Sequence, residues 1–208
     1  MRSPNFKNLW IGLVISMLGA LVLFIMSFFL GKNNFFLLLN TNLGITADYF
    51  FRFFSDLGDG LLWIPLLGYF FYKEGKKSLP FLISCFAIST LLTQVCKILI
   101  LPAELRPTSV IPIELIHIVQ GVTVHTAGSF PSGHTATAFV FYLIFCLVFK
   151  SKWWIILGVV YALVVGYSRV YLAQHFPLDV AGGIIVAVAS VVISVYIDKA
   201  FYKSKTLV

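Results

Sequence analysis

The sequence predicts an all-α fold: a polytopic bundle of six transmembrane helices with an interfacial helix between helices one and two. Composition and patterning both lead to this fold class. Hydrophobic residues fill 60% of the 208 positions and charged residues only 11%, and a soluble domain of this length cannot bury that much apolar surface. The apolar residues also gather into long runs, close to the roughly 20 residues that cross a bilayer.

Six apolar runs give the predicted spans, and the charged residues fall mostly between them. Arg2 and Lys7 precede the first run, which is longer than the apolar region of a signal peptide and therefore predicts an uncleaved span. The second run is short and opens with SDLGDG, so Asp56 and Asp59 are expected at the interface, where acidic groups suit the positive end of a helix dipole. The predicted spans are residues 9–30, 57–72, 79–101, 134–149, 153–169 and 177–197.

Between the first two spans, residues 34–55 read NFFLLLNTNLGITADYFFRFFS. Polar residues repeatedly interrupt this apolar stretch, which favours an interfacial helix along the bilayer surface. Cys85, Cys96 and Cys146 all lie inside apolar runs, and we interpret them as packing residues rather than as a disulfide framework. No repeat or linker divides the sequence, so residues 1–208 are expected to form a single domain.

Lysine and arginine positions predict that both termini lie in the cytoplasm. In that orientation ten basic residues are cytoplasmic: Arg2, Lys7, Lys73, Lys76, Lys77, Lys150, Lys152, Lys199, Lys203 and Lys205. Five lie on the opposite side: Lys32, Arg52, Lys97, Arg106 and Arg169. This excess fits the positive-inside rule for an integral protein of the cytoplasmic (inner) membrane. The net charge of +7 forms no basic stripe, so no nucleic-acid partner is predicted.

Three polar clusters lie at the ends of predicted spans three to six. Because successive spans cross in opposite directions, all three clusters emerge on one membrane face. That face is periplasmic or extracellular if both termini are cytoplasmic. The clusters are Lys97 with Arg106 and Pro107, then Pro131-Ser132-Gly133-His134, then Ser168-Arg169 with His175 and Asp179.

The third cluster contains a candidate nucleophile. Pro177 suits the first position of a helix, which places Asp179 in the first turn with its carboxylate in reach of His175. That contact fixes one imidazole nitrogen of His175 as a donor and leaves the other free to attack. The second cluster supplies another imidazole, His134, as a candidate proton donor.

The other polar groups suit phosphate oxygens. Arg106 and Arg169 each offer a bidentate fork, and Lys97 supplies a point charge. Ser132 and Gly133 bring backbone N–H groups to a helix N-terminus, where anions bind. The alternative is that the three cations anchor their helices at the membrane interface.

The stretch PSGH at 131–134, followed by SRVYLAQHFPLD at 168–179, resembles the type 2 phosphatidic acid phosphatase superfamily of integral membrane lipid phosphatases. The second stretch has that family's pattern of Ser-Arg, five residues, His, three residues and Asp. The family's first motif is Lys, six residues and Arg-Pro, whereas here eight residues separate Lys97 from Arg106. The motif region covers residues 97–179.

The resemblance implies that His175 is a nucleophile that forms a phosphohistidine, with Asp179 as its orienting partner. It implies that His134 is the acid that protonates the leaving lipid oxygen, and that no metal or other cofactor takes part. The implied phosphate-binding residues are Lys97, Arg106, Ser132, Gly133 and Arg169.

The predicted function is hydrolysis of a phosphomonoester or diphosphate of a membrane lipid, with the bilayer and that lipid as expected partners. Undecaprenyl diphosphate, phosphatidylglycerol phosphate, phosphatidic acid and lipid A phosphates remain open as substrates, and the oligomeric state is not predicted. A phosphotransferase of the same superfamily and a non-enzymatic transporter of anionic lipids are the alternatives. His117 and His125, in the loop before PSGH, are expected to have ordinary loop roles.

Overall fold

The computed structural model describes residues 4–205, with the backbone alone from residue 202 onward. Arg2 therefore lies outside the described residues, and so do the side chains of Lys203 and Lys205. The α-helices are α1 (Phe6–Leu30), α2 (Lys32–Leu39), α3 (Ile45–Asp56), α4 (Trp63–Glu74), α5 (Leu79–Val95), α6 (Pro107–Val110), α7 (Gly133–Val148), α8 (Trp153–Tyr171) and α9 (Pro177–Lys205).

Shorter elements join these helices. Three-residue 3-10 helices lie at Gly60–Leu62, Gly75–Lys77 and Ile113–Leu115, and a π-helical turn at Cys96–Ile100 continues α5. Within residues 4–205 the β structure is limited to one isolated antiparallel bridge between Leu105 and Ala127. The all-α prediction is confirmed for the described chain.

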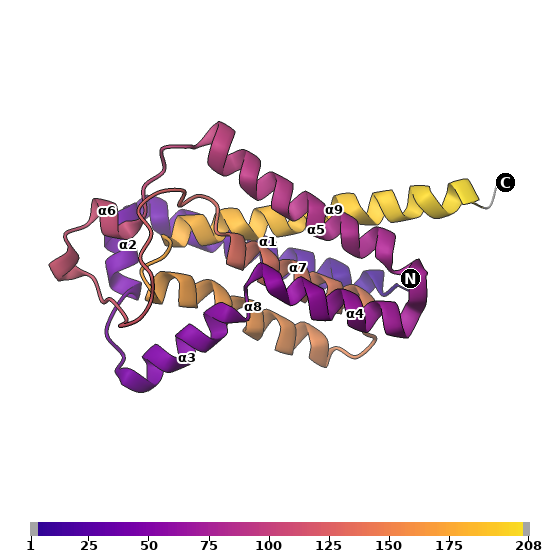
Figure 1. The fold of residues 1–208 in the computed structure, drawn as a ribbon, viewed down its shortest axis with the longest axis horizontal. Coiled ribbons are helices and arrows are strands. Elements are labelled where there is room, and N and C mark those ends of the chain that lie inside the picture. The colour runs from indigo at the N-terminus through magenta and orange to yellow at the C-terminus, as the bar shows by residue number, and fades with distance from the viewer. Residues whose placement is uncertain (1–3, 206–208) are drawn as a thin grey trace.

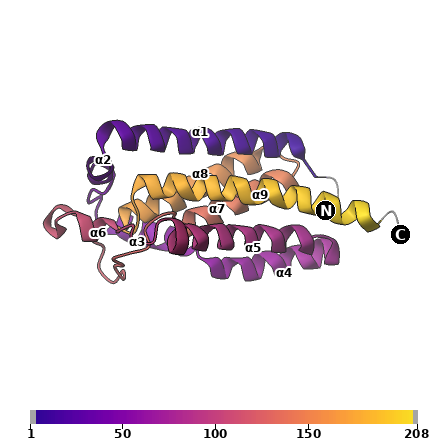
Figure 2. The same cartoon turned by 90° about the horizontal axis from the view of Figure 1, so that it is seen from above.

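The long helices run along the long axis of the molecule, as Figures 1 and 2 show. Helices α7 and α9 form the centre: α7 packs against α8 and α9, and α9 also packs against α1 and α5. Helices α2, α3 and α6 and the long loop before α7 gather at one end of the bundle, while the described ends of the chain lie at the other (Figure 1). We call the end with α2, α3 and α6 the loop end.

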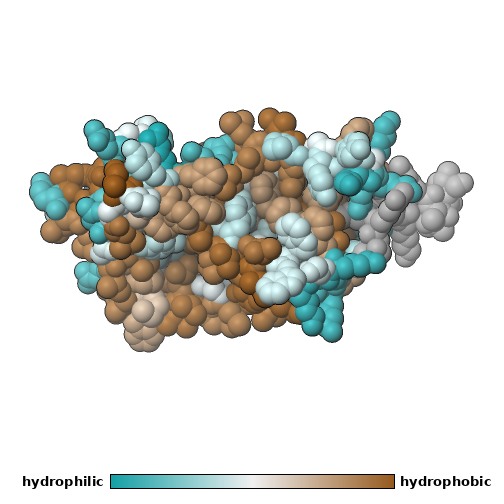
Figure 3. Space-filling model, turned by 90° about the horizontal axis from the view of Figure 1, so that it is seen from below, coloured by the Kyte–Doolittle hydropathy of each residue, from teal (hydrophilic) through white to brown (hydrophobic). Residues whose placement is uncertain are grey.

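The outer surface of the bundle is apolar around the middle of its long axis. Mid-helix side chains such as Leu18, Val22, Leu91 and Val160 are more than half exposed, and Figure 3 shows hydrophobic side chains across the middle of the molecule with hydrophilic ones toward both ends. Among the described residues, four helices are long and apolar enough to cross a membrane: Phe6–Leu30, Leu79–Ile100, Trp153–Tyr171 and Pro177–Phe201. Helices α7 and α4 are apolar but shorter, at 16 and 12 residues.

The predicted spans match helices α1, α5, α7, α8 and α9 closely, but the second one starts later than expected. Residues 57–60 form a turn and Gly60–Leu62 a 3-10 helix, so α4 begins at Trp63. Asp56 therefore ends α3, and Asp59 caps the 3-10 helix instead of lying in the first turn of a long span.

The single interfacial helix predicted over residues 34–55 is instead two helices, α2 and α3. Gly44 has φ of +88°, in the left-handed region that interrupts a helix, and its N–H donates to the Asn42 side chain at 2.8 Å. Helix α2 also turns Phe36 inward, where its ring is fully buried and meets Phe176 edge-on at 5.5 Å between centroids.

Two adjacent glycines let α9 approach the PSGH segment closely. A Cβ atom on Gly182 would lie 2.5 Å from the Phe130 ring, and one on Gly183 would lie 2.6 Å from the backbone oxygen of Ser132. The N–H of Ser132 donates to the backbone oxygen of Asp179 at 3.0 Å. The start of α7 therefore packs directly against the first turns of α9.

We expect Gly183→Ala to lower the free energy of unfolding by about 1–3 kcal/mol, because the new methyl group meets a backbone atom that cannot rotate away. Thermal unfolding in detergent measures the change. Gly68→Ala in α4 is the matched control, since a Cβ there meets no atom within 4 Å. Equal losses in the two variants would contradict the proposed packing.

Candidate active site

The segments that carry the three polar clusters, namely the end of α5 with the loop after it, the start of α7 and the α8–α9 junction, lie toward the loop end of the bundle (Figure 1). A cavity of about 420 Å³ opens there, and we call it the polar cavity. His134 from α7, Arg169 from α8 and Gln174 from the α8–α9 loop line it together with Arg52, Ser55, Asp56, Asp59, Leu172, the Gly121–Thr123 segment and His125. Residues more than a hundred positions apart in sequence therefore share one cavity.

His175 is held by a tight turn after α8. The backbone N–H groups of Gln174 and His175 both donate to the Arg169 backbone oxygen, at 2.9 and 3.1 Å. Ala173, which directly precedes Gln174, takes a left-handed φ of +55°. Pro177 then begins α9, as predicted, and Asp179 lies in its first turn. The Nδ1 atom of His175 lies 3.5 Å from Oδ2 of Asp179, an ion-pair distance slightly longer than a good hydrogen bond.

Asp179 is oriented by a residue that the sequence analysis missed. Its Oδ2 atom accepts hydrogen bonds from the Ser129 hydroxyl at 2.5 Å and from the Phe176 N–H at 2.8 Å. Both Asp179 and Ser129 are fully buried. Ser129 lies two residues before Pro131, and only the folded loop brings it to the carboxylate, so no spacing rule identifies it.

The surroundings of His175 favour its neutral form. Burial lowers the pKa of His175 to about 4, with the positive charges of Arg169 and Arg106 acting in the same direction and Asp179 opposing them. A neutral imidazole that presents Nδ1 to a carboxylate keeps its lone pair on Nε2. This is the protonation state that a nucleophile requires.

Arg106 is buried against the loop before α7. Its Nε donates to the Ala127 oxygen at 3.0 Å, and its Nη1 donates to the backbone and side-chain oxygens of Gln174 at 2.9 and 3.2 Å. Burial lowers the pKa of Arg106, while Asp179 partly compensates. Gln174, also missed by the sequence analysis, links this arginine to Thr123, whose oxygen accepts from Gln174 Nε2 at 3.0 Å.

The guanidinium group of Arg169 has one N–H donor, on Nε, that makes no hydrogen bond within the protein. Its Nη1 donates to the hydroxyl of Ser55 from α3, whereas its Nε is buried without a hydrogen-bond partner. A buried guanidinium N–H beside a polar cavity is a favourable donor for an anion, because leaving it unpaired is unfavourable.

Lys97 lies in the π-helical turn that ends α5. Its Nζ donates to the backbone oxygen of Gly128 at 2.9 Å, next to the Ser129 that holds Asp179. Lys97 therefore lies near the other site residues, although eight residues separate it from Arg106 instead of the family's six.

Helix α7 presents His134 and Ser132 in different ways. The His134 side chain is 30% exposed, and its Nε2 lies 3.8 Å from Oδ2 of Asp59. Ser132 is buried and caps α7: its hydroxyl oxygen accepts from the Thr135 N–H at 3.4 Å and also from the Thr135 hydroxyl at 2.9 Å. The Ser132 N–H already donates to the backbone oxygen of Asp179. The predicted contacts of Ser132 and Gly133 with phosphate stay predictions.

His117 and His125 differ in their surroundings. The Nε2 atom of His117 lies 2.9 Å from Oδ1 of Asp48, which also accepts from the Tyr171 hydroxyl at 2.6 Å. This contact ties the long loop to α3 and α8, the kind of structural role expected for His117. His125 is exposed and lines the polar cavity.

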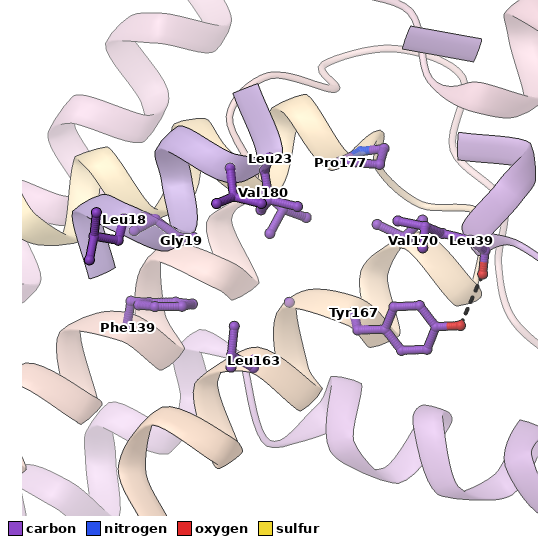
Figure 4. A pocket seen from close by; sticks show the side chains of 13 residues that line it. Leu18, Gly19, Leu23, Leu39, Phe139, Leu163, Tyr167, Val170, Pro177 and Val180 are labelled. Carbon is purple, nitrogen blue, oxygen red and sulfur yellow. Dashed lines mark hydrogen bonds between the residues drawn. The ribbon is translucent and has the colours of Figure 1, made fainter. Parts of the chain in front are cut away.

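A second, apolar cavity of about 360 Å³ lies among α1, α7, α8 and α9 (Figure 4). Its lining includes Leu18, Phe139, Leu163 and Val180, and the Tyr167 hydroxyl turns to the Leu39 oxygen at 3.0 Å. None of the predicted site residues lines this cavity. Within residues 4–205, no group of three or more His, Cys, Asp or Glu side chains is placed to hold a metal ion. Independence from metals stays a prediction.

The chain matches the family model described as PAP2 superfamily over residues 79–203. It is 33% identical to an undecaprenyl-diphosphatase of Sulfolobus acidocaldarius over 71% of this chain and 69% of that protein. It is 30% identical to a lipid A 4'-phosphatase of Bacteroides thetaiotaomicron over 69% of this chain and 67% of that protein.

Two solved structures share the fold. The crystal structure of Aquifex aeolicus LpxE superimposes with a TM-score of 0.65 at 28% identity, covering 77% of this chain and 92% of that one. The PAP2-type phosphatidylglycerolphosphate phosphatase of Bacillus subtilis superimposes with a TM-score of 0.63 at 22% identity, covering 93% and 96%. The apolar helices and these relatives together identify an integral membrane protein.

We expect Arg169→Lys to weaken the binding of inorganic phosphate about tenfold, because lysine keeps the charge but lacks the Nε donor and the planar fork. Isothermal titration calorimetry in detergent measures the dissociation constant. Lys73→Arg in α4, which does not line the polar cavity, is the control. Unchanged affinity in Arg169→Lys would show that this guanidinium does not face the anion.

Proposed function

The chain belongs to the PAP2 superfamily, and from this premise we propose that it is a membrane lipid phosphatase that uses His175 as its nucleophile. The substrate is a phosphomonoester or diphosphate of a lipid whose chain stays in the bilayer. The observation that carries the proposal is the buried His175–Asp179 pair beside a cavity lined by Arg169 and His134.

In the first step, Nε2 of His175 attacks phosphorus and the bond from phosphorus to the lipid oxygen breaks. His134 gives its proton to that oxygen, so the lipid leaves as an alcohol or, from a diphosphate, as a monophosphate. Asp179 holds the other ring nitrogen of His175 and stabilises the positive charge that develops on the imidazole. A distance of 3.5 Å in the free enzyme is compatible with this role, because catalytic hydrogen bonds often shorten when substrate binds.

In the second step, water attacks the phosphorus of the phosphohistidine and the phosphorus–nitrogen bond breaks. His134, now neutral, accepts a proton from that water, and inorganic phosphate leaves. Both steps pass through a transition state with charge spread over three phosphate oxygens, so positioned cations contribute most of the stabilisation. We assign this role to Arg169 and Arg106, with Lys97 behind them, and to the Ser132 hydroxyl and the Gly133 N–H at the start of α7.

We propose six membrane crossings, by α1, α4, α5, α7, α8 and α9. The alignment of the two shorter helices with the four long ones supports this topology (Figures 1 and 2). The positive-inside rule then assigns both termini to the cytoplasm and the loop end to the outer face of the inner membrane. In this arrangement a lipid phosphate in the outer leaflet reaches the site without leaving the bilayer.

The decisive experiment assays phosphate release in detergent from a panel of four lipids: undecaprenyl diphosphate, phosphatidylglycerol phosphate, phosphatidic acid and lipid A. We expect release from at least one lipid and a loss of about a thousandfold or more in His175→Ala. The control His117→Ala removes an imidazole that pairs with Asp48 and not with Asp179. Release that survives in His175→Ala, or release from no lipid at all, would overturn the proposal.

The same panel separates hydrolysis from transfer to another acceptor. Acceptor alcohols added to the assay compete with water for the phosphohistidine. For a hydrolase we expect inorganic phosphate to remain the main product, whereas phosphorylated acceptor as the main product would identify a transferase.

We expect a bell-shaped dependence of kcat/KM on pH. The acid limb should lie near pH 4, because His175 must lose its proton and burial lowers its pKa to about 4. The alkaline limb should report the loss of the proton from His134. An acid limb near the ordinary histidine value of about 6.5 would contradict the burial of the nucleophile.

A further inference from the structure

The turn between α3 and α4 packs against α7 and α8, the helices that contain His134 and Arg169. The Tyr161 hydroxyl of α8 donates to the Leu57 oxygen at 2.5 Å. At Gly58, an added Cβ would lie 2.5 Å from Val165 of α8 and 3.2 Å from the Cβ of His134. The turn is therefore packed against His134 itself, with no room for a larger residue at position 58.

Asp59 uses its two carboxylate oxygens differently. Oδ1 accepts from the Leu61 N–H at 2.8 Å and so caps the short 3-10 helix. Oδ2 faces the cavity, 3.8 Å from Nε2 of His134, with the Asp59 side chain 47% exposed. The cap fixes the carboxylate, so the distance to His134 is set by the backbone of the turn and not by a free side chain.

We propose that Asp59 is the positioning residue of His134, forming a second histidine–carboxylate pair that holds this imidazole protonated for transfer of its proton to the leaving lipid oxygen. This inference rests on the proposed function. It assigns Asp59 no chemical step: the proton moves from His134 to the lipid oxygen, and Asp59 stays ionised throughout.

The charge balance around His134 explains why such a partner is needed. Arg169 lines the same cavity as His134, and its positive charge, together with those of Lys97 and Arg106 at the same site, disfavours a further positive charge on this imidazole. Arg52, His125 and Asp56 line the same cavity. Asp59 is the carboxylate within ion-pair distance of the His134 ring, so it is the group that offsets this repulsion when the phosphate leaves.

Asp59→Asn tests the pair without removing the cap, because the asparagine oxygen still accepts from the Leu61 N–H. We expect the alkaline limb of the kcat/KM profile to move to lower pH by about one unit, with the acid limb unmoved. At pH 8 we expect kcat to fall about tenfold with KM nearly unchanged. Asp56→Asn is the matched control, since Asp56 lies in the same turn and cavity without an ion pair to His134.

The alkaline limb of Asp56→Asn should stay where it is in the unmodified enzyme. An unmoved limb in Asp59→Asn, or equal movement in both variants, overturns the inference. Equal thermal unfolding midpoints in detergent for the two variants exclude a folding defect as the cause.

A second readout does not depend on catalysis. Protein labelled with ¹³C and ¹⁵N at histidine is titrated by NMR in detergent, and the His134 signal is identified by its loss in His134→Asn. We expect its titration midpoint to fall by about one pH unit in Asp59→Asn, and an unmoved midpoint overturns the pairing. Absence of phosphate release from every lipid instead overturns the proposed function, and the titration still decides whether the two residues are coupled.

Discussion

The buried carboxylate of Asp179 is the constraint around which the loop end is built. A buried charge is stable only when hydrogen bonds and opposite charge replace the water it has lost. Ser129 and Phe176 donate hydrogen bonds to its Oδ2 atom, His175 lies at ion-pair distance from the same atom, and its backbone oxygen accepts from Ser132. One residue therefore joins the start of α9, the loop before α7, the first turn of α7 and the turn after α8. Losing this carboxylate would remove the partner of Ser129, Phe176 and His175, whereas the backbone contact with Ser132 does not depend on the side chain.

Close packing and positive charge follow from that centre. Small residues at positions 182 and 183 let α9 approach the start of α7, so the Ser132 amide reaches Asp179. Arg106, Arg169 and Lys97 lie close together at the same end of the bundle, and their positive charges repel one another. The carboxylate of Asp179 offsets this repulsion only in part. The Nε of Arg169 is buried without a hydrogen-bond partner. In the proposed function, a bound phosphate group supplies negative charge and hydrogen-bond acceptors to these cationic side chains.

Much of this arrangement could be predicted from the sequence, because it depends on helix direction and short-range spacing. Alternating spans bring the three motifs to one end, and Pro177 fixes the start of α9 two residues after His175. Contacts made by loops could not be predicted in this way. Ser129, Gln174 and Asp59 reach the site through turns whose course depends on packing, and Asp59 was assigned to a helix dipole because the start of α4 was placed too early. Likewise, Gly44 divides a segment that composition alone presents as one helix.

The most direct test of this arrangement is a crystal or cryo-electron microscopy structure determined with orthovanadate, which mimics phosphorus bonded to five groups. We expect vanadium bonded to Nε2 of His175, with Arg169 and Arg106 donating to its equatorial oxygens and His134 beside the apical oxygen that stands for the leaving group. Vanadate bound elsewhere in the protein, or bound in the polar cavity with His175 turned away from it, would contradict the assignment of the nucleophile and of the site as a whole.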